Sequence, residues 1–530
     1  MASTTMEQGG GASRAVPEAS ERIDPRRMVA FVIMVFGMFM SILDIQIVSA
    51  SLAEIQAGLS ASSNEVSWVQ TSYLIAEVIA IPLSGFLSRA FGTRILFALS
   101  AGGFTVASFL CGLTSSIDQM ILWRAVQGFL GAGMIPTVFA SAYTIFPRSK
   151  FAIVTPVIGL VATLAPTIGP TIGGYITDAM SWHWLFFINV VPGIGITLGV
   201  WALVDFDKPD FDLLSRFDWW GLLTMAGFLG AMEYVLEEGP QYEWLQDDSV
   251  AICAAICVVS GVAFFYRVLT AEEPIVDIRA FADRNFAIGS LFSFCVGMGL
   301  YGLTYLYPRY LAEVRGYSPI MIGETMFVSG AAMFLTAPLV GRLMNKVDPR
   351  AMIGAGLVLF AAGAWLMTWV TKDYDFHELL WPQILRGVGI MLAMIPVNNI
   401  ALGTLAPERM KNASGLFNLT RNLGGAVGLA LINTVLDDRT DLHISRLHDA
   451  VNWGNASAVD LLNSFTQRFQ GMGDAPMMAL KQLSLLVHRQ AVVMGYADAF
   501  FLLTFFYLGL SLLSIFVSKP KPGAGSADAH

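Results

Sequence analysis

Hydrophobic residues gather in this chain into fourteen runs, which are separated by polar stretches. Each run is long enough to cross the roughly 30 Å hydrocarbon core of a bilayer as a helix that rises about 1.5 Å per residue. The runs begin near Met28, Val66, Ile95, Asp118, Phe151, His183, Phe217, Ser249, Asn285, Pro319, Ala351, Leu379, Met410 and Gly495. The pattern predicts an all-α integral membrane protein with fourteen transmembrane helices.

Composition agrees with this class. Hydrophobic residues make up 55% of the 530 residues and charged residues 13%, and the mean hydropathy of +0.62 is too high for a soluble protein. The net charge of −9 argues against nucleic acid as a partner. The cysteines all lie in apolar runs, so we expect neither disulfides nor a metal site; they are Cys111, Cys253, Cys257 and Cys295. We also expect no cofactor and no enzyme activity, because the sequence contains no nucleophile elbow and no phosphate-binding loop.

Basic residues predict the topology. Most of the 31 Lys and Arg residues fall in alternate segments between the runs, and the positive-inside rule places such segments in the cytoplasm. The even number of spans then predicts that both termini are cytoplasmic. We expect the polar tail at 1–27 to be disordered, and a second cytoplasmic tail covers 518–530.

An internal repeat divides the chain. The segment from Gly85 to Arg94, after the second run, recurs as the segment from Gly341 to Arg350 after the tenth. In transporters such repeats place a substrate site near the bilayer midplane, between two halves that rock around it. The predicted parts are a six-helix N-terminal half at 28–204, a two-helix insert with cytoplasmic linkers at 205–284 and a six-helix C-terminal half at 285–517.

The apolar run from Phe151 to Thr177 contains prolines and glycines that would break a soluble helix. In a bilayer, neighbouring helices can cover such a backbone, and small residues let two helices approach closely. Part of the run resembles the antiporter motif of the major facilitator superfamily, with alanine in place of the usual first glycine; its residues are Ala165, Gly169, Pro170, Gly173 and Gly174. The resemblance implies a hinge that seals one face of a cavity, and a kink without a role in coupling is the alternative.

Other motifs extend the resemblance over nearly the whole chain. Arg124, Gln127 and Gly128 resemble the superfamily's fourth-span motif, and Leu43 with Asp44 resembles the first-span motif of the fourteen-span drug:proton antiporters (EmrB/QacA type). Stretches that look like the EmrB branch are Trp184 to Gly193, Pro274 to Asp277 and Ala413 to Gly425. This branch implies the major facilitator fold and a pump in the bacterial inner membrane. It also implies a periplasmic membrane-fusion adaptor and an outer-membrane channel as partners.

The loop after the second run departs from the family pattern. Gly85, Gly92 and Arg94 match the first-loop motif, whereas Arg89 stands where the family usually has aspartate. The resemblance implies that this loop gates the cytoplasmic side. The alternative is that Arg89 and Arg94 only satisfy the positive-inside rule.

Ionisable residues inside spans are the candidates for proton coupling, because burying an uncompensated charge there costs about 2.5 to 3.5 kcal/mol. Asp44 and Arg124 each lie six residues from the outer end of a run, which is roughly 9 Å of helical rise. Equal depth permits an ion pair that proton uptake by Asp44 would release. A purely structural pair is the alternative.

Glu77 lies eleven residues into the second run, roughly 16 Å deep and so near the midplane. A carboxyl group without a partner in a low-dielectric span suits a group that loads and releases protons. There are two alternatives to this role. Glu77 either contacts a cationic substrate or lines a water-filled cavity without taking part in coupling.

Further polar and aromatic residues in the spans are candidates for a substrate cavity. Together with Glu77 they are Tyr73, Phe294, Tyr301, Arg386, Asn398, Asn399, Asn418 and Arg421. Carboxylates in one half and arginines in the other do not restrict the substrate to cations, so neutral and weakly acidic hydrophobic compounds are equally compatible. Most of the aromatic residues are expected to pack between helices or to face lipid.

The longest polar stretch, 437–494, is predicted to lie outside as a periplasmic loop. Its apolar residues follow helical spacing, for example at Leu442, Ile444, Leu447 and Val451, which predicts an amphipathic helix. This segment either docks an adaptor or simply caps the outer face.

These features favour a proton-coupled secondary antiporter that exports hydrophobic drugs or other toxic amphiphiles by alternating access. One alternative is a passive facilitator or channel, which the scarcity of polar groups in the spans opposes. Another is an exporter of a specific endogenous metabolite or fatty acid. Direct ATP drive is not expected, since no phosphate-binding loop is present.

Overall fold

A computed structural model describes residues 24–49, 51–147, 150–271, 274–344 and 346–516, and within these residues the regular structure is entirely helical, without a strand. The predicted tails at 1–27 and 518–530 lie almost wholly outside these ranges. The α-helices are α1 (Pro25–Ser49), α2 (Leu52–Leu59), α3 (Ser63–Cys111), α4 (Ile117–Gly131), α5 (Met134–Ile145), α6 (Phe151–Ala179), α7 (Trp184–Phe187), α8 (Val190–Leu203), α9 (Asp212–Ser215), α10 (Trp219–Glu238), α11 (Asp248–Thr270), α12 (Arg284–Glu313), α13 (Pro319–Leu343), α14 (Pro349–Leu366), α15 (Phe376–Leu402), α16 (Pro407–Ala450), α17 (Ala456–Arg468) and α18 (Ala475–Leu513).

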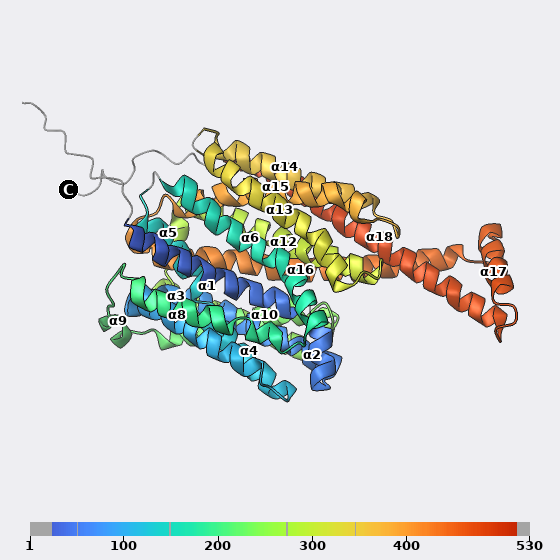
Figure 1. Ribbon diagram of the computed structural model, residues 1–530, viewed down its shortest axis with the longest axis horizontal. Coiled ribbons are helices and arrows are strands. Elements are labelled where there is room, and N and C mark those ends of the chain that lie inside the picture. The colour runs from blue at the N-terminus through green and yellow to red at the C-terminus, as the bar shows by residue number, and fades with distance from the viewer. Residues whose placement is uncertain (1–23, 50, 148–149, 272–273, 345, 517–530) are drawn as a thin grey trace, which may run out of the picture.

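The long helices run side by side in one bundle (Figure 1). We call the end where α1 begins and α18 ends the termini end, and the opposite end, from which α16 and α18 project, the hairpin end. α9 lies at the termini end, and α2 lies at the hairpin end (Figure 1).

Eleven of the described helical segments are long and apolar enough to cross a membrane. One of them, α3, covers two predicted spans, because the chain turns back at Gly92, whose φ of 77° lies in the left-handed region. α10 and α16 are helical where spans were predicted but are not among the eleven, since charged and polar residues such as Glu233 and Arg421 interrupt their apolar surface. The number fourteen therefore stays a prediction.

The predicted halves meet through pairs of helices from both sides. α6 packs against α13, and α3 and α5 pack against α16. Within the predicted N-terminal half, α3 packs against α4 so closely that a Cβ atom at Gly128 would lie 2.4 Å from the carbonyl oxygen of Tyr73. Only glycine fits there, which explains its place in the fourth-span motif. The division into two halves and an insert stays a prediction.

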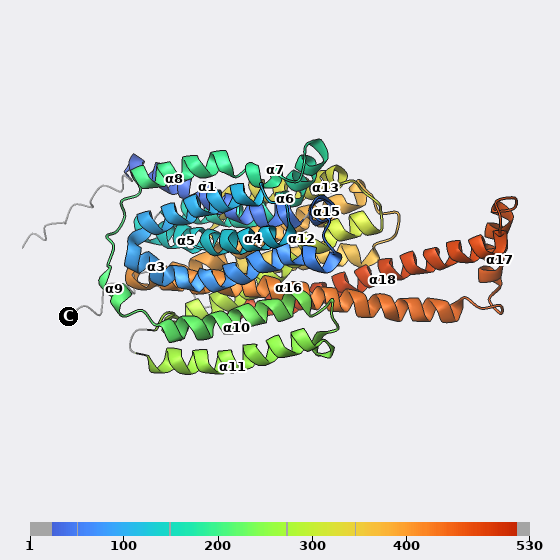
Figure 2. The same ribbon diagram turned by 90° about the horizontal axis from the view of Figure 1, so that it is seen from below.

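The two helices of the predicted insert differ in their surroundings. α10 contacts α3 and α16, so it covers the seam between the predicted halves, whereas α11 packs on the outside of α10 (Figure 2). Few residues of α11 are buried inside the protein, which is expected of a helix that faces lipid. α10 is thus the insert helix that reaches the interior.

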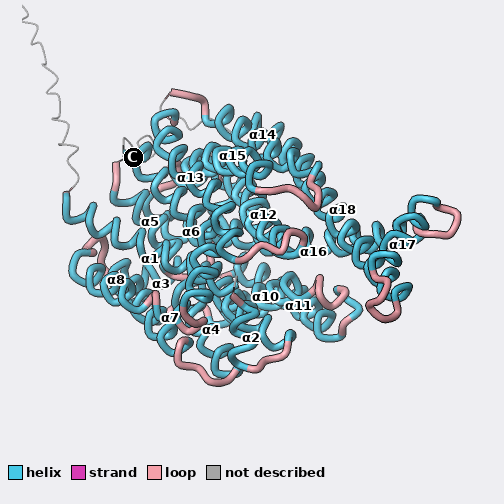
Figure 3. Tube along the Cα trace, turned by 45° about the vertical axis from the view of Figure 1, so that its right-hand side comes forward, coloured by secondary structure: helices cyan, strands magenta, loops and turns pink. Residues whose placement is uncertain are grey.

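Most of the segment 437–494 is helical. α16 continues to Ala450 and α18 begins at Ala475, so the two helices run side by side beyond the bundle, with α17 at the tip (Figures 1 and 3). One face of α18 is buried in this hairpin, through Ala479, Leu483 and Val487. Of the residues whose spacing predicted an amphipathic helix, Leu442, Ile444 and Leu447 lie half-buried on α16, whereas Val451 follows the helix and is exposed.

Candidate functional site

Asp44 on α1 and Arg124 on α4 form a buried ion pair. Arg124 Nη1 lies 2.6 Å from Asp44 Oδ2, and both side chains are fully buried. The Asp44 carboxylate also accepts hydrogen bonds from Gln127 Nε2 at 3.1 Å and Asn189 Nδ2 at 2.7 Å. The contact that equal depth permits is therefore present, and it joins helices of the predicted N-terminal half; its role in coupling stays a prediction.

The guanidinium group of Arg124 is held from several sides. Its Nε donates to the carbonyl oxygen of Val69 at 3.1 Å, and its Nη1 donates to Gln127 Oε1 at 2.8 Å. The ring of Tyr73 lies over it, with 4.2 Å between Cζ and the ring centroid. Tyr73 therefore packs on Arg124 and does not line the cavity described next.

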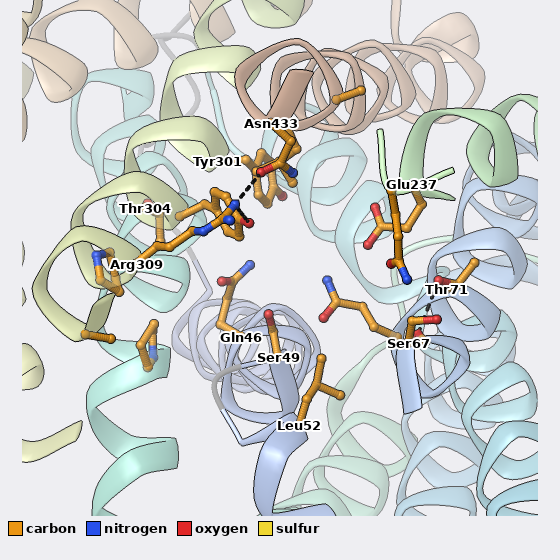
Figure 4. Close-up of a pocket in the computed structure, with 18 of the residues that line it drawn as sticks. Gln46, Ser49, Leu52, Ser67, Thr71, Glu237, Tyr301, Thr304, Arg309 and Asn433 are labelled. Atoms are coloured by element: carbon orange, nitrogen blue, oxygen red, sulfur yellow. Dashed lines mark hydrogen bonds between the residues drawn. The ribbon is translucent and has the colours of Figure 1, made fainter. Parts of the chain in front are cut away.

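A cavity of about 560 Å³ opens at the hairpin end between α1, α3, α10, α12, α13 and α16 (Figure 4). Its wall is part polar and part apolar, and the polar residues include Gln46, Ser49, Thr71, Glu237 and Asn433. The rim is formed by the ends of these helices at the hairpin end. The cavity thus lies between the predicted halves, as the sequence repeat led us to expect, but its wall includes the insert helix α10.

A narrower pocket of about 50 Å³ continues this cavity toward the middle of the bundle. The two share Gln46, Gln70, Glu237 and Tyr301, and the narrow pocket reaches Glu77. The Glu77 side chain is 2% exposed, and its Oε1 has no hydrogen-bond partner among the described residues. Of the predicted cavity residues, Glu77 and Tyr301 therefore lie on the wall.

The other predicted cavity residues lie outside this wall. Arg386 is fully buried and donates to Thr304 Oγ1 at 2.5 Å and to Gln383 Oε1 at 3.3 Å. Arg421 donates to Asn418 Oδ1 at 2.5 Å, one helical turn away. Both arginines are therefore engaged by neighbouring side chains, where sequence depth alone had suggested contact with a substrate.

Phe294, Asn398 and Asn399 also lie outside the described cavity. The backbone of Phe294 is in close contact with Gly424, where an added Cβ would meet its carbonyl oxygen at 2.0 Å. Asn398 is fully buried beside Gly159 of α6, and neither of its amide atoms has a partner among the described residues. Residues at the same depth as a cavity can thus pack between helices, because a helix presents only one face to the cavity.

The antiporter motif on α6 contacts helices of both predicted halves. A Cβ atom at Gly169 would lie 2.3 Å from Gln46 Cβ on α1, and one at Gly174 would lie 2.3 Å from Pro319 Cβ on α13. α6 runs unbroken through Pro166 and Pro170. The small residues therefore allow α6 to fit between α1 and α13; a hinge function stays a prediction.

The first-loop motif lies at the termini end, where the predicted halves are in contact. A Cβ atom at Gly85 would lie 3.0 Å from the carbonyl oxygen of Lys411, at the start of α16. Lys411 forms an ion pair with Asp207, and its Nζ also donates to the carbonyl oxygen of Ser88 at 2.9 Å. Asp207 accepts a hydrogen bond from the backbone N–H of Thr93 at 2.9 Å. The loop that lacks the usual aspartate thus has a carboxylate supplied by the linker after α8.

The arginines of this motif make aromatic contacts. The Cζ of Arg89 lies 5.7 Å from the ring centroid of Phe86, and that of Arg94 lies 5.1 Å from the ring centroid of Trp201. These contacts are compatible with a gating role of the two arginines and with a role only as positive charges on the cytoplasmic side, so both interpretations remain.

Sequence reasoning missed two sets of site residues. Asn189, quoted only as part of a motif, contacts Asp44. Glu233, Glu237 and Glu238 were not considered as site residues, although the four-residue spacing of the first two places them on one helix face. That spacing was the available signal.

Comparison with known proteins identifies related transporters. The family model of the Major Facilitator Superfamily matches residues 34–429. The colistin resistance protein EmrB of Acinetobacter baumannii is 42% identical over 492 residues, which cover 93% of this chain and 96% of that protein. The multidrug export protein EmrB of Escherichia coli is 29% identical over 93% of this chain and 96% of its own length. The fatty acid resistance protein FarB of Neisseria gonorrhoeae is 27% identical over 92% of this chain and 95% of its own length.

A solved structure supports the fold. The human organic anion transporter MFSD10 matches with a TM-score of 0.57 over 91% of this chain and 100% of its own, at 13% identity. At that identity the similarity concerns the fold alone.

Proposed function

We propose, from the premise that this chain belongs to the major facilitator superfamily, that it exports hydrophobic drugs or other toxic amphiphiles across the bacterial inner membrane by proton-coupled antiport. Members of this superfamily are transporters and not enzymes, as the sequence predicted. The relatives named for colistin resistance, multidrug export and fatty acid resistance support an efflux function.

The observation that carries the proposal is the cavity at the hairpin end of the bundle. It opens at the hairpin end and narrows to Glu77, whereas contacts such as that of Lys411 with the carbonyl oxygen of Ser88 join the predicted halves at the termini end. In our proposal the hairpin end is periplasmic, in line with the positive-inside rule. The conformation is then the outward-open state of an alternating-access cycle.

The two buried carboxyl groups have different access in this state. Glu77 lies on the narrow pocket, whereas Asp44 is fully buried by Arg124 and its amide neighbours. We therefore assign proton uptake from outside to Glu77, and to Asp44 a later proton-dependent rearrangement of α1 against α4. A charge that crosses 100 mV gains about 2.3 kcal/mol, enough for roughly tens-fold accumulation per proton.

The experiment is transport in proteoliposomes with an imposed pH gradient. A growth-inhibition screen over dyes, uncouplers, fatty acids and antibiotics selects the compound. We expect export against its concentration gradient by the wild type, loss of this export in Glu77→Gln, and normal export in the control Glu54→Gln, which changes an exposed carboxylate on α2. Equal flux in both directions without a pH gradient would favour a passive facilitator instead.

We also propose that the hairpin of α16, α17 and α18 docks a periplasmic membrane-fusion adaptor, which would continue to an outer-membrane channel. The hairpin projects beyond the bundle, and none of the residues of α17 is buried. Photo-crosslinking from Gln467 on α17 to a co-expressed adaptor tests this. Crosslinks from Gln467 with none from Glu54 are expected, and their consistent failure would favour a simple cap.

A further inference from the structure

Glu233 and Glu237 of α10 lie one helical turn apart on the face that meets the cavity. Both line the narrow pocket, and Glu237 also lines the larger cavity, opposite Arg309 (Figure 4). Neither carboxyl group forms a hydrogen bond or ion pair with another described residue, whereas the adjacent Glu238 accepts hydrogen bonds from Thr71 at 2.9 Å and Ser67 at 3.3 Å. Glu238 is therefore engaged in structure, and the other two are not.

A third carboxyl group, that of Glu77, faces the same pocket from the opposite side. Glu77 of α3 reaches the same narrow pocket, is 2% exposed, and has no partner for Oε1 among the described residues. Glu233 lies within electrostatic range of both Glu237 and Glu77. Three carboxyl groups from two helices thus converge on one small space, where an uncompensated charge is costly.

The basic side chains nearest to this space are occupied elsewhere. Arg309, on the α12 wall, donates to Tyr305 Oη at 2.7 Å and to Asn433 Oδ1 at 2.9 Å, and its Nε lies 3.4 Å from Glu313 Oε2. Arg124 is paired with Asp44 and Arg421 is bonded to Asn418, although one terminal nitrogen of each has no hydrogen-bond partner among the described residues. The wall of the narrow pocket contains no Lys or Arg among the described residues. The carboxyl groups of this pocket can therefore be neutralised by protonation, as proposed above for Glu77, or balanced by a bound cation.

The surroundings suit a cation that also has an apolar part. Leu74, Val78 and Leu429 lie beside the carboxyl groups on the wall of the narrow pocket. The adjoining 560 Å³ is large enough for the body of a drug-sized molecule. A small apolar surface next to unpaired carboxylates is the arrangement expected for an amphiphilic cation.

We propose that α10 belongs to the transport pathway and that Glu233 and Glu237, together with Glu77, form a subsite for the positively charged group of an amphiphilic substrate. This inference rests on the export function proposed above and specifies its substrate class. It gives the insert a direct role in binding, in addition to covering the seam between α3 and α16.

The test uses the purified full-length protein in lipid nanodiscs and two probes of nearly equal shape and opposite charge, tetraphenylphosphonium and tetraphenylborate. Equilibrium binding of each radiolabelled probe is measured for the wild type, Glu233→Gln, Glu237→Gln and Glu233→Asp. The control is Asp248→Asn, which removes an exposed carboxylate from the neighbouring α11. Melting temperatures confirm that each variant is folded.

We expect the wild type to bind the phosphonium at least tenfold more tightly than the borate. Each Glu→Gln variant should lose about tenfold in phosphonium affinity, which corresponds to about 1.4 kcal/mol. Glu233→Asp should retain most of the affinity, and the control should equal the wild type. No phosphonium binding by the wild type, equal binding of both probes, or unchanged affinity in folded Glu→Gln variants would overturn the proposal.

A second measurement distinguishes a cation-binding role of these carboxyl groups from a role in proton transfer. It records proton release on probe binding with a pH-sensitive dye. Normal phosphonium affinity with lost proton release in Glu233→Gln would assign the carboxyl group to proton transfer and overturn the cation subsite. Failure of the wild type to export against a gradient would overturn the proposed function and would leave the binding result to be judged by itself.

Discussion

Asp44→Asn keeps nearly the shape of the side chain and removes the negative charge that Arg124 faces. Both groups are fully buried, and the ion-pair distance is 2.6 Å. Removing one partner of a buried pair typically costs about 3 to 5 kcal/mol, because the other charge is left uncompensated. The hydrogen bonds from Gln127 and Asn189 add less, since such bonds between membrane helices average about 0.6 kcal/mol. The orphaned guanidinium therefore dominates, and we expect a loss of stability of about 3 kcal/mol.

Thermal melting in nanodiscs measures this loss, and the double variant Asp44→Asn/Arg124→Gln identifies its source. The double variant removes the orphaned charge as well, so it should melt at a higher temperature than Asp44→Asn alone. Proton-driven export is the second readout. If Asp44 takes part in proton coupling, the double variant recovers stability without recovering export against a gradient.

Two results would refute this reasoning. An unchanged melting temperature for Asp44→Asn would show that the two charges do not depend on each other. Export restored by the double variant would show that the pair is only structural, which is the alternative that the sequence left open.

Three other changes have defined outcomes. Gly128→Ala places a Cβ atom 2.4 Å from a backbone carbonyl oxygen of α3, so it should lower stability by about 1 to 3 kcal/mol in thermal melting. Lys411→Ala removes a partly exposed ion pair worth up to about 1 kcal/mol, so it should raise the labelling of Ser88→Cys several-fold as the termini end opens more often. The hydroxyl of Tyr317, followed by the backbone N–H of Phe376, lowers the pKa of Asp375 below its usual value. A carboxyl group with a lowered pKa stabilises the fold above its unfolded pKa and loses this contribution as the pH falls through the folded value. Asp375→Asn should therefore melt below the wild type at pH 7, and the difference should disappear as the pH falls through the lowered pKa of Asp375.

Each of these predictions has a matched control. Gly195→Ala adds the same methyl group where nothing lies within 4 Å, and it should leave stability unchanged. Lys481→Ala removes an exposed charge from the hairpin and should not alter labelling at the termini end. Asp373→Asn removes an exposed carboxylate two residues before Asp375 and should melt like the wild type at pH 7. Equal behaviour of a variant and its control would contradict the contact on which that prediction rests.

The buried ion pair shows which kind of contact can be predicted from the sequence. Helical rise is constant, so residue counts along two apolar runs predicted that Asp44 and Arg124 lie at one depth, and the structure joins them. Arg386 and Asn398 do not line the described cavity, because depth does not determine which face of a helix meets a cavity, and their contact with a substrate stays a prediction. Facing depends on the rotation of each helix against its neighbours.

The insert helix α10 shows which site contacts could not be predicted from the sequence. Glu233 and Glu237 are visible in the sequence at four-residue spacing, yet their convergence with Glu77 requires α10 to lie against α3 and α16. The carboxylate of Asp207 likewise reaches Lys411, 204 residues away in the chain.

The sequence by itself determined the helices, the family and the depth of the charged residues, because bilayer thickness and helical rise act on each run separately. Only the tertiary structure decided which residues surround the cavity, since contacts between helices join segments that are far apart in the chain and have no signature in either segment alone.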